Sequence, residues 1–247
     1  HIPSFVSSLP DTAIPVPTGG PTPAAVASVA DPRMAQLVGR DSHLPAVPLE
    51  ARAPDALRQR FARPPRWAPE VVREKRFSDR QPTDAAVLVP IVLRSEPTVL
   101  LTERTAHLST HSGQVAFPGG KRDPEDVSAQ ATALREAQEE VGLAAGDVEV
   151  LGNLPIYTTG TAFLITPVVA LVDPRARLHP NPYEVADVFE VPLSFLLDPA
   201  NHERHAMVWN GVPREWFAMP YQDGDRQRYI WGATAGMLRN LYRFLSA

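Results

Sequence analysis

The segment 119–143 constrains the fold most strongly, because a glycine pair leads into a helical stretch that ends in three glutamates. A helix advances about 100° per residue. Three glutamates near its end therefore fall within roughly 100° of one another, and they are Glu136, Glu139 and Glu140. The opposite side carries the apolar residues Val127, Ala131, Leu134, Ala137 and Val141. We expect the apolar face to pack on a core and the other face to present carboxylates.

The three glutamates predict a divalent-metal site. Neighbouring carboxylates repel one another, and an ordinary surface helix would place lysines between them. Mg²⁺ is a hard cation that prefers oxygen ligands and compensates their charge. We therefore predict that Glu136, Glu139 and Glu140 bind Mg²⁺, with Mn²⁺ as an alternative ion. A solvated acidic helix face is the competing interpretation.

This stretch resembles the Nudix box, whose pattern is glycine, five residues, glutamate, seven residues, then Arg-Glu-apolar-x-Glu-Glu-x-Gly-apolar. Gly120 and the run 135–143 follow that pattern. Asp126 stands where glutamate is usual, and eight residues separate it from Arg135. The resemblance implies a diphosphate hydrolase with an α/β fold, an α/β/α sandwich around a mixed central sheet. It also implies that Arg135 fixes a carboxylate.

A second signature lies upstream, in the runs 100–104 and 111–120. It resembles the coenzyme A diphosphatase branch of the Nudix family, although Thr105 replaces a small residue and Ser109 replaces a second arginine. His107 and His111 flank the missing arginine, and we expect them to be structural. The resemblance implies substrate contacts from Arg104, Phe117, Gly119 and Gly120. A glycine turn made only for packing, and an Arg104 paired with Glu103 or Asp126, stay open.

Hydrolysis of a phosphoanhydride requires a catalyst that neutralises charge, positions water and helps to remove a proton. The base is left open among the helix glutamates, Glu184 and Glu190, whose other interpretation is ordinary surface acid. The residues that we expect to be catalytic are Glu136, Glu139, Glu140, Glu184 and Arg135.

Composition narrows the classes of partner. The chain has 247 residues and a formal charge of −4, which argues against a nucleic-acid-binding surface. It has no cysteine, which excludes a disulfide framework and a cysteine nucleophile and fits a reducing cytosol. No apolar run is long enough to predict a membrane span. We expect a cytoplasmic protein with a small nucleotide-diphosphate substrate, and a homodimer is left open.

Composition divides the chain into three segments. Residues 1–48 are rich in proline and predict a loose extension with at most a short helix at 32–39. Residues 49–82 form a basic lead-in, and residues 83–247 are the expected hydrolase domain. The basic residues of the lead-in are more typical of solvated surface charge than of phosphate binding.

Periodicity and turn residues predict the elements of that domain. A hairpin is expected from 85–93 and 98–102, and a helix from 128 to 141 with Gly142 as its cap. A closing helix over 236–244 places one apolar stripe, Met237, Leu241 and Phe244, on the sheet. The other expected strands are 114–117, 148–157, 163–172, 185–191, 206–209 and 215–218.

Three functions are compatible with these features. The leading hypothesis is hydrolysis of coenzyme A or its thioesters to 3′,5′-ADP and 4′-phosphopantetheine, as the resemblance implies. The alternative is hydrolysis of ADP-ribose or another nucleoside-diphosphate derivative. A non-catalytic nucleotide-binding module belongs to a different class, and the three intact helix glutamates argue against it.

Overall fold

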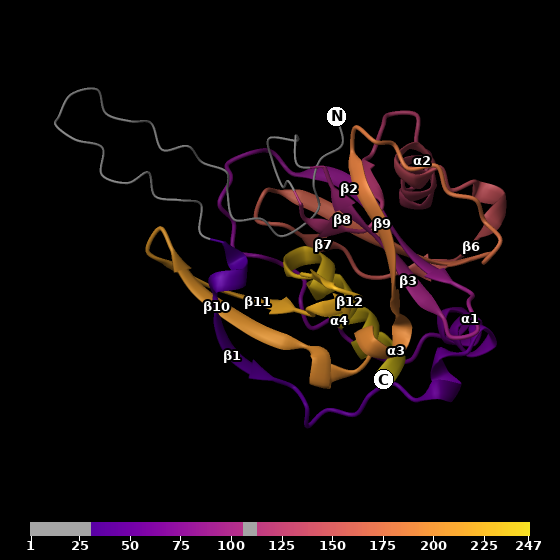
Figure 1. The fold of residues 1–247 in the computed structure, drawn as a ribbon. Coiled ribbons are helices and arrows are strands. Elements are labelled where there is room, and N and C mark those ends of the chain that lie inside the picture. The colour runs from indigo at the N-terminus through magenta and orange to yellow at the C-terminus, as the bar shows by residue number, and fades with distance from the viewer. Residues whose placement is uncertain (1–30, 106–112) are drawn as a thin grey trace.

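A computed structural model of the chain describes residues 31–105 and 113–247 (Figure 1). Its helices are α1 (Pro54–Ala62), α2 (Ala129–Val141), α3 (Leu193–Leu196) and α4 (Gly232–Ser246), with short 3-10 helices at Pro32–Met34, Leu49–Arg52, Ala145–Asp147 and Pro199–Asn201. Its strands are β1 (Gln36–Arg40), β2 (Thr83–Val92), β3 (Thr98–Arg104), β4 (Val115–Ala116), β5 (Gly119–Lys121), β6 (Val148–Asn153), β7 (Tyr157–Thr158), β8 (Phe163–Val172), β9 (Val185–Pro192), β10 (Glu203–Trp209), β11 (Val212–Ala218), β12 (Tyr221–Asp223) and β13 (Arg226–Arg228).

The central sheet has eight strands and is mixed, as expected. Its main path runs β4-β3-β2-β8-β6, with β5 on β2, β7 on β8 and β9 on β3. β2 and β8 pair in parallel from Thr83↔Phe163 to Val92↔Val172, whereas the other pairs are antiparallel. The expected hairpin is confirmed at Ile91↔Val99. This long parallel pair of β2 and β8 lies within the main path of the sheet.

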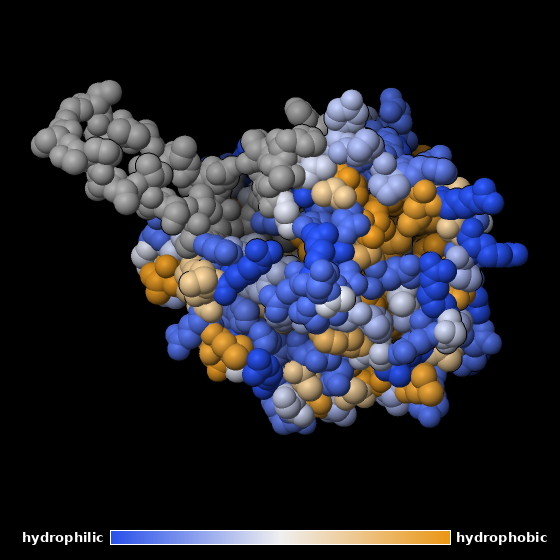
Figure 2. Space-filling view, in the orientation of Figure 1, coloured by the Kyte–Doolittle hydropathy of each residue, from blue (hydrophilic) through white to orange (hydrophobic). Residues whose placement is uncertain are grey.

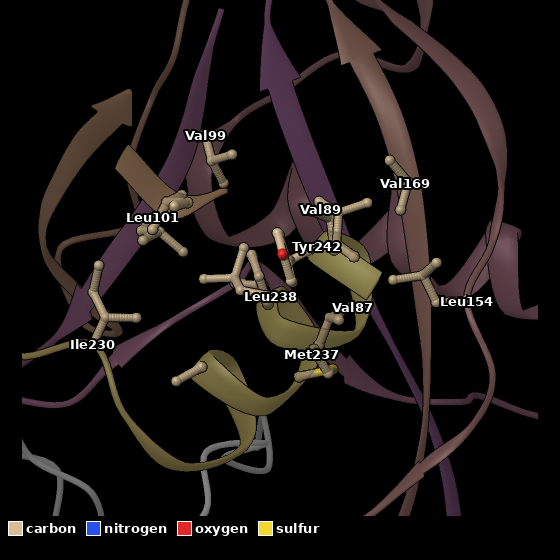
Figure 3. Close-up of a cluster of buried hydrophobic side chains, with 14 of the residues drawn as sticks. Val87, Val89, Val99, Leu101, Leu154, Val169, Ile230, Met237, Leu238 and Tyr242 are labelled. Carbon is tan, nitrogen blue, oxygen red and sulfur yellow. The ribbon is translucent and has the colours of Figure 1, made fainter. Parts of the chain in front are cut away.

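The two faces of this sheet pack on different helices because side chains alternate along each strand. Val87 and Val89 of β2 point into the main core, which also holds the apolar side chains of α4 (Figure 3). Ala86 and Leu88 point the other way, onto Ala133 and other small residues of α2. The expected sandwich of helices around a mixed sheet is therefore confirmed.

α4 is buried on more sides than its predicted stripe required. Leu238, Arg239, Asn240 and Tyr242 are buried together with the expected apolar residues. A second sheet with the order β1-β10-β11 lies beyond α4 and explains this burial, since α4 packs between the two sheets (Figure 1). Full burial of each large apolar side chain contributes about 1.5–3 kcal/mol, so α4 is a central element of the core.

Segments before residue 83 also join this structure. The expected short helix at 32–39 is confirmed only for Pro32–Met34, because β1 follows and pairs with β10 (Gln36↔Ala206). The basic lead-in contains α1, which buries Leu57. The division of the chain at residues 48 and 82 stays a prediction.

The surface of the described residues is mixed. Figure 2 shows hydrophilic side chains over most of one face, with apolar side chains exposed over β1 and β10 at its lower left. The apolar residues exposed on this outer sheet are Leu37, Val38, Val208 and Val212. Among the described residues, no helix is both long and apolar enough to span a membrane.

Candidate active site

α2 begins and ends where the sequence indicates. The Ser128 hydroxyl accepts a hydrogen bond from the Ala131 amide at 3.0 Å and caps the first turn. Gly142 ends the helix at φ +70°, and its amide donates to the Gln138 carbonyl at 3.0 Å. These two caps fix both ends of α2, and so they fix the position of the glutamates in its last two turns beside β2 and β5.

The glutamates do not share one outer face, and this part of the prediction was wrong. Glu136 and Glu140 are only 4% and 6% exposed and lie in the buried stripe with Ala133 and Ala137. Val127, placed on the packing side, precedes the helix and is 87% exposed. The small alanines leave room for two carboxylates under the helix, whereas Glu139 stays at its exposed margin.

The glycine pair forms a strand and makes room for one of these carboxylates. Gly119–Lys121 is β5, which pairs with β2 at Ala86↔Gly120. A Cβ on Gly120 would lie 2.1 Å from the Glu136 carboxyl group, and a Cβ on Gly119 would lie 2.5 Å from the Ala86 carbonyl oxygen. Gly119 therefore permits strand packing, and Gly120 permits close approach of Glu136 to the backbone.

Arg135 connects Asp126, which precedes α2, with two glutamates of α2. Its Nε and Nη2 donate to the two Asp126 carboxylate oxygens at 3.0 and 2.9 Å, and its Nη1 donates to Glu136 and Glu139 at 3.1 and 3.2 Å. Asp126 also accepts from the Asp123 amide and from the Thr132 hydroxyl, each at 2.9 Å. These hydrogen bonds with Arg135, opposed by burial, hold the pKa of Asp126 well below its usual range.

Asp126 is thus an anchor that the sequence did not reveal. In the Nudix pattern, Asp126 only stood where a glutamate is usual, with eight residues before Arg135 in place of seven. Asp126 closes the turn 123–126, because its amide donates to the Asp123 carbonyl and its side chain accepts from the Asp123 amide. The structure gives Asp126 the task of orienting Arg135.

The charge of Glu136 and Glu140 is poorly compensated within the described residues. Burial raises the pKa of Glu136 to about 7; the Arg135 charge opposes this shift and the Glu139 charge adds to it. Burial and the Glu136 charge likewise raise the pKa of Glu140 well above its usual range, although the Gly119 amide donates to Glu140 at 3.4 Å. Glu136 Oε2 is buried and has no hydrogen-bond partner among the described residues.

Glu184 approaches the same site from a turn tied to the end of α2. The Asn181 amide donates to the Glu140 carbonyl at 2.8 Å, and the Glu184 amide donates back to the Asn181 carbonyl at 3.1 Å. Burial raises the pKa of Glu184, and the Glu184 charge in turn raises the pKa of Glu136 and Glu140. We call Glu136, Glu140 and Glu184 the carboxylate cluster.

Arg104 faces this cluster from the end of β3. Burial lowers its pKa, while the charges of Glu140 and Glu184 oppose that shift. Its Nε is buried and has no partner among the described residues. The alternative pairings are not observed there, because Glu103 bonds Arg226 and Arg228 instead, and Asp126 bonds Arg135.

Other candidate residues lie elsewhere. Glu190 accepts from Arg94 Nη2 at 2.9 Å and from the Thr98 hydroxyl, so it is a paired residue of β9 and not a member of the cluster. Phe117 is 3% exposed and lies in the main core. His107, Ser109 and His111 lie outside the described residues.

The residues at this site fit a hard divalent cation. They offer carboxylate oxygens, two of which, Glu136 Oε2 and Glu184 Oε2, are buried and have no partner among the described residues, and burial together with the neighbouring carboxylate charges raises the pKa values of Glu136 and Glu140. The described residues do not hold three such donors in a ready coordination shell, and Arg135 contacts both Glu136 and Glu139. Chemically, the site places buried carboxylates opposite a buried guanidinium, an arrangement suited to a cation and a phosphate side by side.

The chain is similar to a known protein family and to proteins of two bacteria. The family model for the NUDIX domain matches residues 82–209. The chain is 46% identical over 167 residues to a protein of Photorhabdus laumondii named "Uncharacterized Nudix hydrolase NudL", an alignment that covers 68% of this chain and 87% of that protein. A protein of the same name from Yersinia enterocolitica is 46% identical over 157 residues, covering 64% and 78%.

Solved structures are less similar. The Nudix hydrolase RenU of M. smegmatis is 27% identical, covers 46% of this chain and 71% of its own, and superimposes with a TM-score of 0.38. A score this low supports no inference about the site.

Proposed function

This chain belongs to the Nudix hydrolase family, and from that membership we propose that it hydrolyses the diphosphate of coenzyme A or of an acyl-coenzyme A with a divalent cation. It is a hydrolase of phosphoanhydride bonds, acting on nucleoside-diphosphate derivatives. The carboxylate cluster opposite Arg104, whose buried Nε has no partner among the described residues, is the observation that carries the proposed reaction. The coenzyme A assignment is supported by the run 100–104 and by Gly119 and Gly120.

The roles of the side chains follow from their surroundings. Glu136, Glu139 and Glu140 would hold the cation, which we take to be Mg²⁺, with Mn²⁺ as a substitute. A bound cation neutralises the phosphate oxygens and withdraws electron density from the phosphorus that is attacked. Arg135 would keep Glu136 and Glu139 oriented, since Asp126 fixes its guanidinium from the other side.

Arg104 and Glu184 complete the proposed reaction. The Arg104 guanidinium has a buried donor to offer, and a substrate phosphate would satisfy it through a charge-assisted hydrogen bond. Glu184 lies on a separate turn, its buried Oε2 has no partner among the described residues and its pKa is raised, so it is suited to accept a proton from the attacking water. Gly120 keeps the backbone clear of Glu136.

Incubation of the pure protein with Mg²⁺ and coenzyme A tests the proposal. We expect 3′,5′-ADP and 4′-phosphopantetheine, identified by mass, and a single heavy-oxygen label from the solvent in one product. No turnover of coenzyme A beside efficient turnover of ADP-ribose would move the substrate to the alternative class. No turnover of any diphosphate would favour a binding module. The cytoplasmic location and a homodimer stay predictions.

A further inference from the structure

The described residues enclose a cavity with a volume of about 530 Å³. It is bounded by the segment 71–77, by β10 and β11, and by the start of α4. None of its lining residues belongs to the carboxylate cluster or to the residues that we assign to the reaction. Sites for small molecules have volumes of roughly 300–1,000 Å³, so this cavity has the size of a ligand site.

The walls of the cavity are aromatic. Phe77, Tyr157, Trp216 and Trp231 all line it. Trp216 and Trp231 meet edge to face with their ring centroids 5.6 Å apart, which fixes the orientation of both indoles. Rigid aromatic walls of this kind favour a planar ring, because nucleic-acid bases stack on aromatic faces in the same way.

The lining is also basic, although the chain as a whole carries a formal charge of −4. Arg73, Lys75, Arg204 and Arg214 line the cavity, against the carboxylates Glu74 and Glu215. The carboxylates are already engaged: Glu74 accepts from the Tyr157 hydroxyl at 2.8 Å and the Gly160 amide at 2.9 Å, and Glu215 lies 3.8 Å from Arg204 Nη1. Two positive charges therefore remain in excess around the cavity.

Arg214 is the cation that most needs a counter-ion. Its guanidinium lies over the Phe77 ring at 4.8 Å, and its Nη1 donates to the Lys75 carbonyl at 3.3 Å. Its Nε is buried without a partner among the described residues. Burial lowers the pKa of Arg214 although the Glu74 charge opposes this shift, so a bound anion would supply a partner for the buried Nε.

From this geometry we infer that the cavity binds a mononucleotide-like anion, with its planar ring on the aromatic wall and its phosphate on Arg214, Lys75 and Arg73. The site is separate from the diphosphate-hydrolysing site. A ring alone would leave the cations unpaired, and a phosphate alone would leave the aromatic wall in water.

Adenosine 5′-monophosphate is a suitable probe, measured by calorimetry and by quenching of tryptophan fluorescence with a chelator present. Without a cation, the carboxylate cluster repels phosphate, so binding reports the cavity. We expect one AMP site per chain, with adenosine and inorganic phosphate each binding about tenfold or more weakly. Glu140→Gln should bind AMP as the wild type does, whether or not the protein hydrolyses coenzyme A.

Three variants make the test specific. Arg214→Met should weaken AMP about tenfold, whereas Arg63→Met, at an exposed arginine outside the cavity, should leave it unchanged. Ala206→Phe fills the cavity without removing a charge and should abolish binding, even if Arg214→Met folds poorly. Absence of AMP binding to the wild type, binding unaffected by Ala206→Phe, or phosphate binding as tightly as AMP would each overturn the inference.

Discussion

Two groups of buried charge lie on opposite faces of the central sheet, and they differ in how that charge is compensated. On the α4 side, Arg239 is 0% exposed and contacts Asp41 at 2.8 Å and Glu70 at 2.6 Å. Arg204 adds a contact of 3.0 Å to Asp41, and Arg243 adds one of 2.7 Å to Glu70. We call these five residues the α4 ion-pair network.

The pKa values in the two groups move in opposite directions. Burial by itself would raise the pKa of Asp41 and of Glu70, but the hydrogen bonds and charges of their arginines outweigh it and lower both values. In the carboxylate cluster the same burial is not outweighed, and the pKa values of Glu136 and Glu140 rise. The α4 ion-pair network is complete within the protein, whereas the carboxylate cluster needs something from outside.

This difference separates a structural role from a functional one. A buried ion pair that loses one partner leaves an uncompensated charge and destabilises the fold. A buried carboxylate that already lacks a partner destabilises the free protein and gains a counter-charge only when a ligand binds. Stability should therefore depend on the α4 ion-pair network, and activity on the carboxylate cluster.

The largest effect is expected from Arg239→Met. It should lower the free energy of unfolding by about 3–5 kcal/mol, because Asp41 and Glu70 stay buried without their central cation. Urea unfolding measures this loss. Arg58→Met removes an exposed arginine that contacts Glu149 at 2.9 Å, and it should barely move the midpoint. Equal losses in the two variants would contradict the structural role of the network.

Glu140→Gln should lower activity without lowering stability. We expect kcat for diphosphate hydrolysis to fall about 10²- to 10³-fold, because the cation loses a buried ligand. The midpoint of unfolding in chelator should not fall, since a like charge beside Glu136 is removed. Glu125→Gln, at an exposed acid before α2, is the control and should keep full activity. Full activity in Glu140→Gln would refute the assignment of this glutamate.

Low pH should lower the stability of the folded protein through His202, which contacts Arg239 of α4. His202 accepts a hydrogen bond from Arg239 Nη1 at its Nδ1 (2.9 Å) and donates from Nε2 to the Leu196 carbonyl (2.7 Å), so it is held neutral. Burial, with the Arg239 charge, lowers its pKa from 6.5 to about 4. The unfolded chain therefore binds the extra proton first, and stability present above pH 6.5 declines toward pH 4, by about 3 kcal/mol in total.

The pH experiment compares variants in a background with less opposing titration. Glu136, Glu140 and Glu184 all have raised pKa values, so each favours the folded state as the pH falls; removing Glu136 takes away one contribution, and the other two are common to both variants. We therefore compare Glu136→Gln with Glu136→Gln/His202→Gln by urea unfolding between pH 7 and pH 4, in chelator. The double variant should lose distinctly less stability over this range. Parallel curves would show that His202 does not titrate as expected.

The smallest effect is expected from Asp126→Asn. Because Asp126 orients Arg135, its neutral analogue should raise the Mg²⁺ concentration for half-maximal activity about 10- to 100-fold, while saturating Mg²⁺ restores most of kcat. Asp123→Asn is the matched control, since Asp123 Oδ2 lies 3.5 Å from Arg135 Nε and is half exposed. A drop in kcat that Mg²⁺ does not restore would place Asp126 in the reaction itself.

Local signals predicted much of the fold. Ser128 and Gly142 mark the ends of α2, and apolar, β-branched runs mark β2, β3, β8 and β9. β1 and β5 were missed because each depends on its partner strand: Gly119–Lys121 has glycines that favour a turn, yet it pairs with β2. α4 was predicted with one apolar stripe because the strands expected at 206–209 and 215–218 carry no local sign that they form a second sheet beyond it.

By itself, the sequence determined which residue types could carry chemistry: helix glutamates, a neighbouring arginine and a glycine that tolerates close approach. Only the tertiary structure decided which of them lie together. It brought Glu184 beside Glu140 and Arg104, paired Glu190 with Arg94, and turned Glu136 inward. The physical reason is that helical spacing sets an angle about one axis, whereas burial and charge compensation depend on the sheet, turns and caps that surround that axis.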